Sequence, residues 1–283
     1  MQKLLASDAL RGIRIAISAS DSLDLARLGL AETHFRLALA EIGRCVLIAG
    51  GEIFYGGHLR EDGYTTFLIR ELQKYSRRDS PLTICLAWQE HRELALSELA
   101  ARRRSLGLIG SIVSLGPDGD EVDPTDGRQE AAEPVADPAL RRRALTAMRR
   151  YMANQTHGRV LIGGKRAGFQ GEYPGLMEEA LISLEHDHPV YLAGGFGGVT
   201  SDIAAALAID GAAWLPAFAD APEPDPRWEA GRARLSAFAA APGESATRNG
   251  LTADENRRLV ASHRPSEIAT LVSLGLGRLH QKP

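Results

Sequence analysis

The stretch RVLIGGKRAGFQGEYPGLMEEALISLEHDHPVYLAGG, residues 159–195, contains the pattern that decides the fold. Its two ends, RVLIGG (159–164) and PVYLAGG (189–195), are short apolar runs that finish in paired glycines, and each predicts a buried strand. Between them, PGLMEEALISLEHD (174–187) has the apolar spacing of a helix and begins with proline, which is favoured in a first helical turn. A strand, a helix and a second strand in this order predict two neighbouring parallel strands.

The same alternation of strands and helices extends outward over most of the chain. The strands are continuous apolar runs, not period-two alternations, and this indicates a sheet that is covered on both faces. We therefore expect an α/β fold, a Rossmann-like open parallel sheet with helices on both faces. The other expected strands are IRIAIS (13–18), VLIAGG (46–51), PLTICLAW (81–88) and LIGSIVSLG (108–116).

Two changes of composition suggest the domain organisation. Residues 117–138 are acidic, contain prolines and have few large apolar side chains, so we expect a surface loop there. After residue 215 only helical patterns remain, which predicts a sheet domain (1–215) with a C-terminal helical extension (216–283). The last helix is apolar enough to suggest a homo-oligomer. Its apolar residues are Ile268, Leu271, Val272, Leu274 and Leu276.

The composition excludes several classes of protein. A net charge of −3 and a pI of about 6.3 provide no basic field, so we expect no nucleic-acid partner. No signal peptide and no apolar run long enough to span a membrane is visible, which predicts a cytoplasmic protein without membrane contact. Cys45 and Cys85 lie in apolar runs and are interpreted as buried side chains. The eight histidines are scattered, and we expect neither a metal nor a cofactor.

Glycine turns follow three of the expected strands. In an open parallel sheet, ligands bind at the carboxyl ends of the strands, so turns after 46–51, 159–164 and 189–195 would converge on one cleft. A helix that starts there offers free backbone N–H groups and partial positive charge to a phosphate. Tight turns alone would also explain the glycines. Neither G-x-G-x-x-G after the first strand nor G-x-x-x-x-G-K-[ST] is present, which argues against a standard dinucleotide fold and a P-loop NTPase.

The predicted ligand-binding residues lie in these turns or in polar segments next to them. We expect the planar guanidinium of Arg60 and the positive charge of Lys165 to bind phosphate. Asp62 would contact ribose or base. The complete set is Ser18, Ser20, Gly50, Gly51, Arg60, Asp62, Gly163, Gly164, Lys165, Gly171, Pro174, Gly175, Glu179, Gly194, Gly195, Phe196, Gly197 and Gly198.

Glu178 and Glu179 follow the helix start at Pro174. Acidic residues near a helix start are favoured by the helix dipole alone, so ordinary stabilisation is one interpretation. The other is that one carboxylate faces the cleft and binds ribose, or stabilises an oxocarbenium-like sugar carbon during N-glycosidic cleavage. Adjacent helical residues point about 100° apart, so we expect at most one of the two to face a ligand.

Three segments together resemble a known family. They are GGEIFYGGHLREDGYT (50–65), LIGGKRAGFQGEYPGLMEEAL (161–181) and PVYLAGGFGGVTSDIA (189–204). They are similar to the SLOG superfamily, a Rossmann-like group that includes the lonely-guy phosphoribohydrolases and the DNA-processing protein A family. The resemblance covers about residues 10–215 and is greatest to the SLOG domains of bacterial conflict systems, often found beside TIR or SIR2 domains.

The resemblance implies two functions. In the sensor branch the protein binds a nucleotide, ADP-ribose-like or derived from NAD, in an antiphage signalling system whose TIR-domain effector is a separate protein. In the hydrolase branch Glu178 or Glu179 is the catalytic carboxylate of a phosphoribohydrolase-like reaction. The phosphoribohydrolases carry P-G-G-x-G-T-x-x-E, whereas this chain has PGLMEE (174–179) and lacks the G-x-G-T portion. That difference favours the sensor branch.

Overall fold

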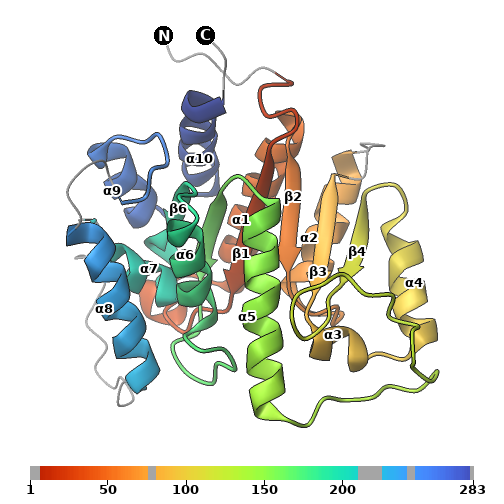
Figure 1. Ribbon diagram of the computed structural model, residues 1–283. Coiled ribbons are helices and arrows are strands. Elements are labelled where there is room, and N and C mark those ends of the chain that lie inside the picture. The colour runs from red at the N-terminus through yellow and green to blue at the C-terminus, as the bar shows by residue number, and fades with distance from the viewer. Residues whose placement is uncertain (1–6, 76–80, 210–224, 241–245, 281–283) are drawn as a thin grey trace.

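A six-stranded parallel sheet forms the centre of the computed structural model, which describes residues 7–75, 81–209, 225–240 and 246–280 (Figure 1). The strand order is β4-β3-β2-β1-β5-β6, and every pair of neighbouring strands is parallel. The Rossmann-like α/β fold is therefore confirmed. The strands are β1 (Arg14–Ser20), β2 (Glu52–Gly56), β3 (Leu82–Leu86), β4 (Gly110–Ser114), β5 (Arg159–Gly163) and β6 (Val190–Ala193).

Helices cover both faces of the sheet. One face packs against α1, α2, α4 and α10, and the other packs against α5, α6 and α7, with α8 outside α6 and α7. In Figure 1, α5 stands in front of the sheet and the C-terminal helices lie at the β6 side. The helices are α1 (Glu32–Ile48), α2 (Tyr64–Leu72), α3 (Trp88–Arg92), α4 (Leu96–Leu106), α5 (Pro138–Gln155), α6 (Gly175–Glu185), α7 (Gly198–Ala206), α8 (Pro226–Ala240), α9 (Ala253–Ala261) and α10 (Pro265–His280).

The expected strand at 46–51 is wrong. Residues 46–48 form the last turn of α1, and the strand lies later, at Glu52–Gly56, inside a segment expected to be a loop. The buried stripe of Phe35, Leu39 and Ile42 continues at Val46 with helical spacing, so the apolar run VLI belongs to the helix. Short apolar runs fit a buried helix end as well as a strand, and only the neighbouring elements decide between them.

The segment between β4 and α5 is a surface loop that is fastened to α3. Arg128 donates hydrogen bonds to the carbonyl oxygens of His91, at 2.8 Å, and Leu94. Glu133 forms an ion pair with Arg92. At the end of the loop, Asp137 caps α5 by accepting the amide hydrogen of Ala139 at 2.9 Å. Hydrogen bonds to backbone carbonyls and an ion pair thus hold this loop in place, although the loop has no hydrophobic core of its own.

The C-terminal helices share the core of the sheet domain. Ile268, Leu271, Val272 and Leu276 of α10 are buried in the same cluster as α1 and β1, so the apolar face that suggested an oligomer is covered within the chain. The expected boundary near residue 215 lies outside the described residues, and the two-part division stays a prediction. Among the helices that the structure describes, none combines the length and apolarity needed to cross a membrane.

The glycines after β6 allow α9 to approach the sheet. A Cβ at Gly194 would lie 2.8 Å from the carbonyl oxygen of Val260, and one at Gly195 would overlap the carbonyl of Ser262. Neither glycine has a positive φ, so close packing and not backbone conformation explains them.

We therefore expect Gly195→Ala to lower the free energy of unfolding by about 3 kcal/mol, because the added methyl group must push the end of α9 away from β6. Gly168→Ala is the matched control: nothing lies within 4 Å of its Cβ, and its φ of +68° costs about 1 kcal/mol. Urea unfolding measures both. Equal losses would contradict the packing explanation.

A group of histidines lies at the amino edge of the sheet. The rings of His186 and His188 are 5.8 Å apart, and His157 accepts the amide hydrogen of Arg14 at 3.0 Å. Burial, helped by the nearby charges of His186 and Arg159, lowers the pKa of His188 to about 4. His188 is therefore neutral in the folded protein.

This lowered pKa predicts a loss of stability in mild acid. Between pH 6.5 and 4 the unfolded chain binds a proton at His188 that the folded chain does not, so the free energy of unfolding falls as the pH falls through this window. His91, whose pKa burial also lowers to about 4, adds an effect of the same sign. His188→Gln should make the pH dependence of the unfolding midpoint shallower. An identical slope in His188→Gln would contradict the assignment.

Candidate functional site at the β1–β5 switch point

The neighbouring strands β1 and β5 send the helices that follow them to opposite faces of the sheet. α1 follows β1 on one face, and α6 follows β5 on the other. In open α/β sheets such a reversal leaves a crevice outside the carboxyl ends of the two strands. Ser20 and Gly163 are paired at this edge. We call Ser18, Ser20, Gly163, Gly164, Lys165, Gly175 and Glu179 the switch-point site.

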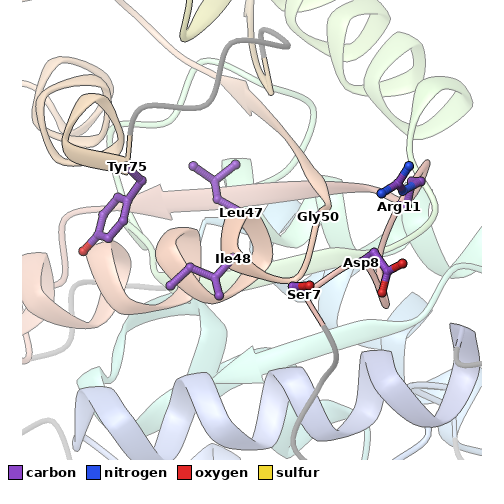
Figure 2. A pocket seen from close by; sticks show the side chains of 7 residues that line it. All are labelled: Ser7, Asp8, Arg11, Leu47, Ile48, Gly50 and Tyr75. Carbon is purple, nitrogen blue, oxygen red and sulfur yellow. The ribbon is translucent and has the colours of Figure 1, made fainter.

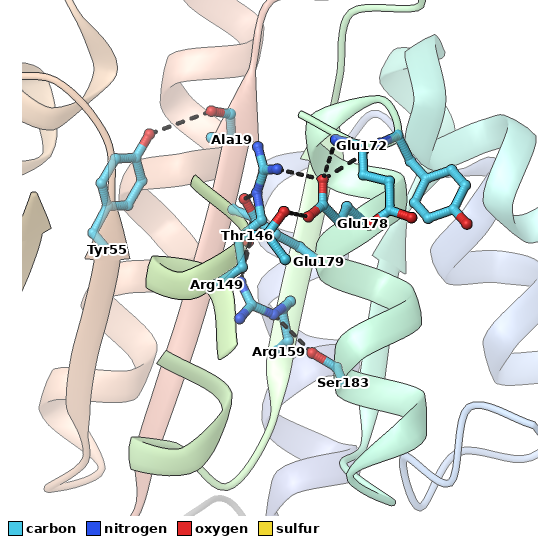
Figure 3. A network of polar contacts seen from close by, with 11 residues as sticks. Ala19, Tyr55, Thr146, Arg149, Arg159, Glu172, Glu178, Glu179 and Ser183 are labelled. Atoms are coloured by element: carbon cyan, nitrogen blue, oxygen red, sulfur yellow. Dashed lines mark hydrogen bonds and ion pairs between the residues drawn. The ribbon is translucent and has the colours of Figure 1, made fainter. Parts of the chain in front are cut away.

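Glu178 is sealed between α5, α6 and the loop that precedes α6 (Figure 3). Its Oε2 lies 2.6 Å from Arg149 Nη1, and its Oε1 accepts the hydroxyl hydrogen of Thr146. The amides of Glu172 and Tyr173 donate to Oε2 at 3.1 and 3.4 Å. Only 3% of the side chain is exposed. Glu178 therefore fastens the loop to α5 and has no capacity left for a ligand.

Glu179 points instead toward the end of β1. Its Oε2 accepts hydrogen bonds from the Ser18 hydroxyl and from Arg159 Nη1, the latter at 2.7 Å. Its Oε1 lies 3.5 Å from Arg149 Nε. The side chain is 14% exposed, against 3% for Glu178. Of the two adjacent glutamates, Glu179 is the one that contacts β1 and β5.

The start of α7 is already occupied by a carboxylate of the chain itself. Asp24 Oδ2 accepts the amide hydrogen of Gly198 at 2.7 Å and lies 2.9 Å from Arg166 Nη1. Arg27 approaches Oδ1 at 3.0 Å, and the Asp24 side chain is fully buried. Burial alone would raise the pKa of Asp24, but the Gly198 amide and Arg166 hold it below its usual value. The expected phosphate position at Gly198 is therefore filled by Asp24.

The start of α6 is open by comparison. The amides of Gly175, Leu176 and Met177 have no hydrogen-bond acceptor within the described residues, and no side chain caps this helix. A Cβ at Gly175 would meet only Arg149 Nη2, at 3.1 Å. Of the two helix starts proposed for phosphate, that of α6 is the one whose first amide has no acceptor among the described residues, and such N–H groups can bind an external acceptor.

Lys165 and Asp21 form an ion pair at the outer rim of this edge. Their Nζ and Oδ2 atoms are 2.7 Å apart, and both side chains are about half exposed, at 54% and 53%. Burial would raise the pKa of Asp21, but hydrogen bonds from Lys165 and Tyr64 lower it. Such an exposed pair is weak and exchanges partners readily, so Lys165 can turn to another anion.

A family model described as SLOG cluster2 matches residues 9–259, a span that contains the whole sheet and the switch-point site. The chain belongs to the SLOG superfamily. This membership indicates nucleotide-related binding or processing. A search among curated proteins finds no match to the chain.

Several predicted residues of this SLOG chain do not lie at the switch-point site. Gly50 and Gly51 precede β2 and lie at the amino edge of the sheet, so the idea that three glycine turns converge on one cleft is wrong for this turn. Phe196 is fully buried against Phe35, with the ring centroids 5.5 Å apart. Gly197 packs against the Asp24 carboxylate.

The remaining predicted residues surround the site or support it. Arg60 and Asp62 are exposed in the loop after β2, where the Asp62 carbonyl accepts a hydrogen bond from Arg36. Gly171 is buried directly against the Arg149 and Glu178 side chains, and Pro174 precedes α6. Gly163 and Gly164 have positive φ values, and a Cβ at either would overlap neighbouring atoms, so the turn after β5 requires glycine.

Arg149, Arg159, Thr146 and Asp24 were missed by the sequence analysis. Arginines in helical runs are usually solvated, and an aspartate after a strand is usually a helix cap, so their patterns carried no distinct signal. Arg159 is the exception. A charged residue at the start of the otherwise apolar run RVLIGG could have been recognised as a buried cation that needs a carboxylate.

A pocket of about 570 Å³ lies at the opposite edge of the sheet (Figure 2). It is lined by residues before β1, at the end of α1 and in the 3-10 turn after α2, and it contains none of the site's glutamates or arginines. The lining residues are Ser7, Asp8, Arg11, Leu47, Ile48, Gly50 and Tyr75. Within the described part of the chain, no group of three or more His, Cys, Asp or Glu residues is arranged to hold a metal ion.

The two glutamates predict different responses to substitution. Glu178→Gln removes the closest charged partner of the Arg149 guanidinium, which is 8% exposed, and should lower the free energy of unfolding by about 3 kcal/mol. Glu185→Gln on the same helix removes only a surface ion pair with Arg234 and should cost less than about 1 kcal/mol. Urea unfolding at neutral pH checks both. A loss in Glu178→Gln no larger than that in Glu185→Gln would contradict the sealed pair.

Proposed function

We propose that this SLOG protein binds a nucleotide, ADP-ribose-like or derived from NAD, outside the carboxyl ends of β1 and β5. The observation that carries the proposal is Glu179, a partly exposed carboxylate held at the point where the strand order reverses. Rossmann-type proteins bind ribose hydroxyls with an acidic side chain. Glu179 is the residue that we assign to the ribose.

The phosphates belong at the start of α6. The free amides of Gly175, Leu176 and Met177 and the partial positive charge of the helix attract an anion. Lys165 adds a positive charge at the rim, and Arg60 is an exposed guanidinium on the neighbouring loop. The start of α7 takes no part, because Asp24 already binds the Gly198 amide.

Cleavage of an N-glycosidic bond is the alternative function, and Glu179 is again the residue it would use. In that reaction water adds to the sugar carbon and the base leaves with a proton, while a carboxylate stabilises the positive charge on the sugar. Glu178 is not available as the second carboxylate of a two-carboxylate mechanism, because it is buried against Arg149 and Thr146. Of the two glutamates, only Glu179 is partly exposed, and this favours binding over hydrolysis.

The role in antiphage signalling, with a separate TIR-domain effector, follows from the resemblance to conflict-system SLOG domains. A chain that binds a nucleotide without consuming it suits the sensing step of such a system. The effector would respond to the bound and the empty forms of this protein.

Incubation with a mixture of AMP, NAD, ADP-ribose and cyclic ADP-ribose tests the proposal directly. The bound fraction is separated, and mass spectrometry identifies both the retained species and the products. We expect one nucleotide to be retained intact, and to raise the free energy of unfolding by about 2.7 kcal/mol at a hundredfold excess over its Kd. Release of free base or nicotinamide would instead establish the hydrolase, and the absence of any retained or altered species would reject both functions.

Substitution of Glu179 separates the two functions. If Glu179 binds ribose, Glu179→Gln should weaken binding about tenfold, because a charged hydrogen-bond acceptor is lost. If Glu179 is catalytic, the same variant should retain nucleotide and lose turnover. Glu185→Gln, with its carboxylate on the outer surface of the same helix, is the matched control and should bind as the wild type does.

A further inference from the structure

Among the described residues, Arg159 is the largest of the fully buried side chains, with 1% of it exposed. It begins β5, and the other side chains of this strand are apolar or absent. A buried guanidinium is costly unless it is paired and hydrogen-bonded, so its position in the sheet requires an explanation. The packing of β5 does not provide one, because an apolar residue would fill the same place without that cost.

One nitrogen of the Arg159 guanidinium contacts both Glu179 and the neighbouring strand β1. Nη1 lies 2.7 Å from Glu179 Oε2 and also donates to Ser18 Oγ at 2.7 Å. The Ser18 hydroxyl in turn donates to the same Glu179 oxygen. These three groups form a closed triangle of hydrogen bonds in which each proton has one acceptor.

The guanidinium is itself held in place by α6. Its Nε donates to Ser183 Oγ at 2.8 Å, and Ser183 lies one helical turn after Glu179 (Figure 3). Arg149, the other arginine near Glu179, gives its closest contact to Glu178 at 2.6 Å and approaches Glu179 only at 3.5 Å. Arg159 is therefore the cation that fixes the direction of the Glu179 carboxylate.

We propose that Arg159 is a positioning residue which, together with Ser18, holds the Glu179 carboxylate at the switch-point site in the orientation that a ligand requires. This inference rests on the proposed nucleotide function. Arg159 itself is buried beneath Glu179 and acts through it. A side chain held within a narrow range of orientations binds more tightly than a free one, because less freedom is lost on binding.

A double-mutant cycle with ADP-ribose tests the inference. The dissociation constant is measured calorimetrically for the wild type, Arg159→Met, Glu179→Gln and the double variant, well below their unfolding midpoints. We expect Arg159→Met to weaken binding about tenfold or more, and to add less than about twofold when Glu179 is already Gln. Arg159→Lys, which keeps the charge and tests the case in which Arg159→Met does not fold, should fall between the wild type and Arg159→Met.

Arg278→Met is the matched control. Arg278 forms an ion pair with Glu255 between α10 and α9, on elements that do not contribute to the switch-point site. Its loss should lower the unfolding midpoint without changing the affinity for ADP-ribose. Unchanged affinity in both Arg159→Met and Arg159→Lys, with only their midpoints lowered, would show that Arg159 is merely structural and overturn the proposal.

A measurement without ligand keeps this test independent of the nucleotide proposal. Labelling of carboxyl groups by a carbodiimide and glycine ethyl ester, mapped by mass spectrometry, reports how firmly each glutamate is held. We expect Glu179 to react about tenfold faster in Arg159→Lys than in the wild type, with Glu178 unchanged. If the wild type binds no nucleotide but this difference is found, the nucleotide function fails and the positioning role stands. Equal rates at Glu179 would overturn the role itself.

Discussion

Two arginine–glutamate pairs in the interior, together with Ser18, join four segments of the fold. Arg149 comes from α5, Glu178 and Glu179 from α6, and Arg159 from β5, and Ser18 brings in the end of β1. Removing such charges from water costs several kcal/mol per ion, and the cost is offset only where hydrogen bonds satisfy nearly every polar atom. Here Glu178 accepts hydrogen bonds at both oxygens and Glu179 at Oε2, and the positions of α5, α6 and the loop before α6 depend on these contacts.

The dependence on contacts between segments also explains which elements could be predicted from the sequence. The runs at 159–164 and 189–195 are continuous, apolar and ended by glycine, and they were correctly predicted as strands because no other element fits them. The run at 46–51 has the same local composition but continues the buried stripe of α1 from Ile42 to Val46. Local pattern alone does not distinguish a helix end from a strand, so tertiary packing decided the outcome.

Only part of the candidate site could be predicted, again because local pattern does not show which distant side chains are in contact. Glu178 and Glu179 could be identified from their place after Pro174, but their roles differ only through partners such as Arg149 and Ser18, which no local pattern connects to them. The glycines were noticed correctly, yet those at 194 and 195 serve the approach of α9. Bare backbone is needed for contact with another chain segment as well as for contact with a ligand.

The carboxylate of Asp24 determines how the start of α7 is stabilised. The first amide of α7 already has a hydrogen-bond acceptor within the chain. This helix start therefore needs no ion from solution and is formed without a ligand. For the nucleotide sensor that we propose, the position of α7 therefore depends on Asp24 and not on the ligand.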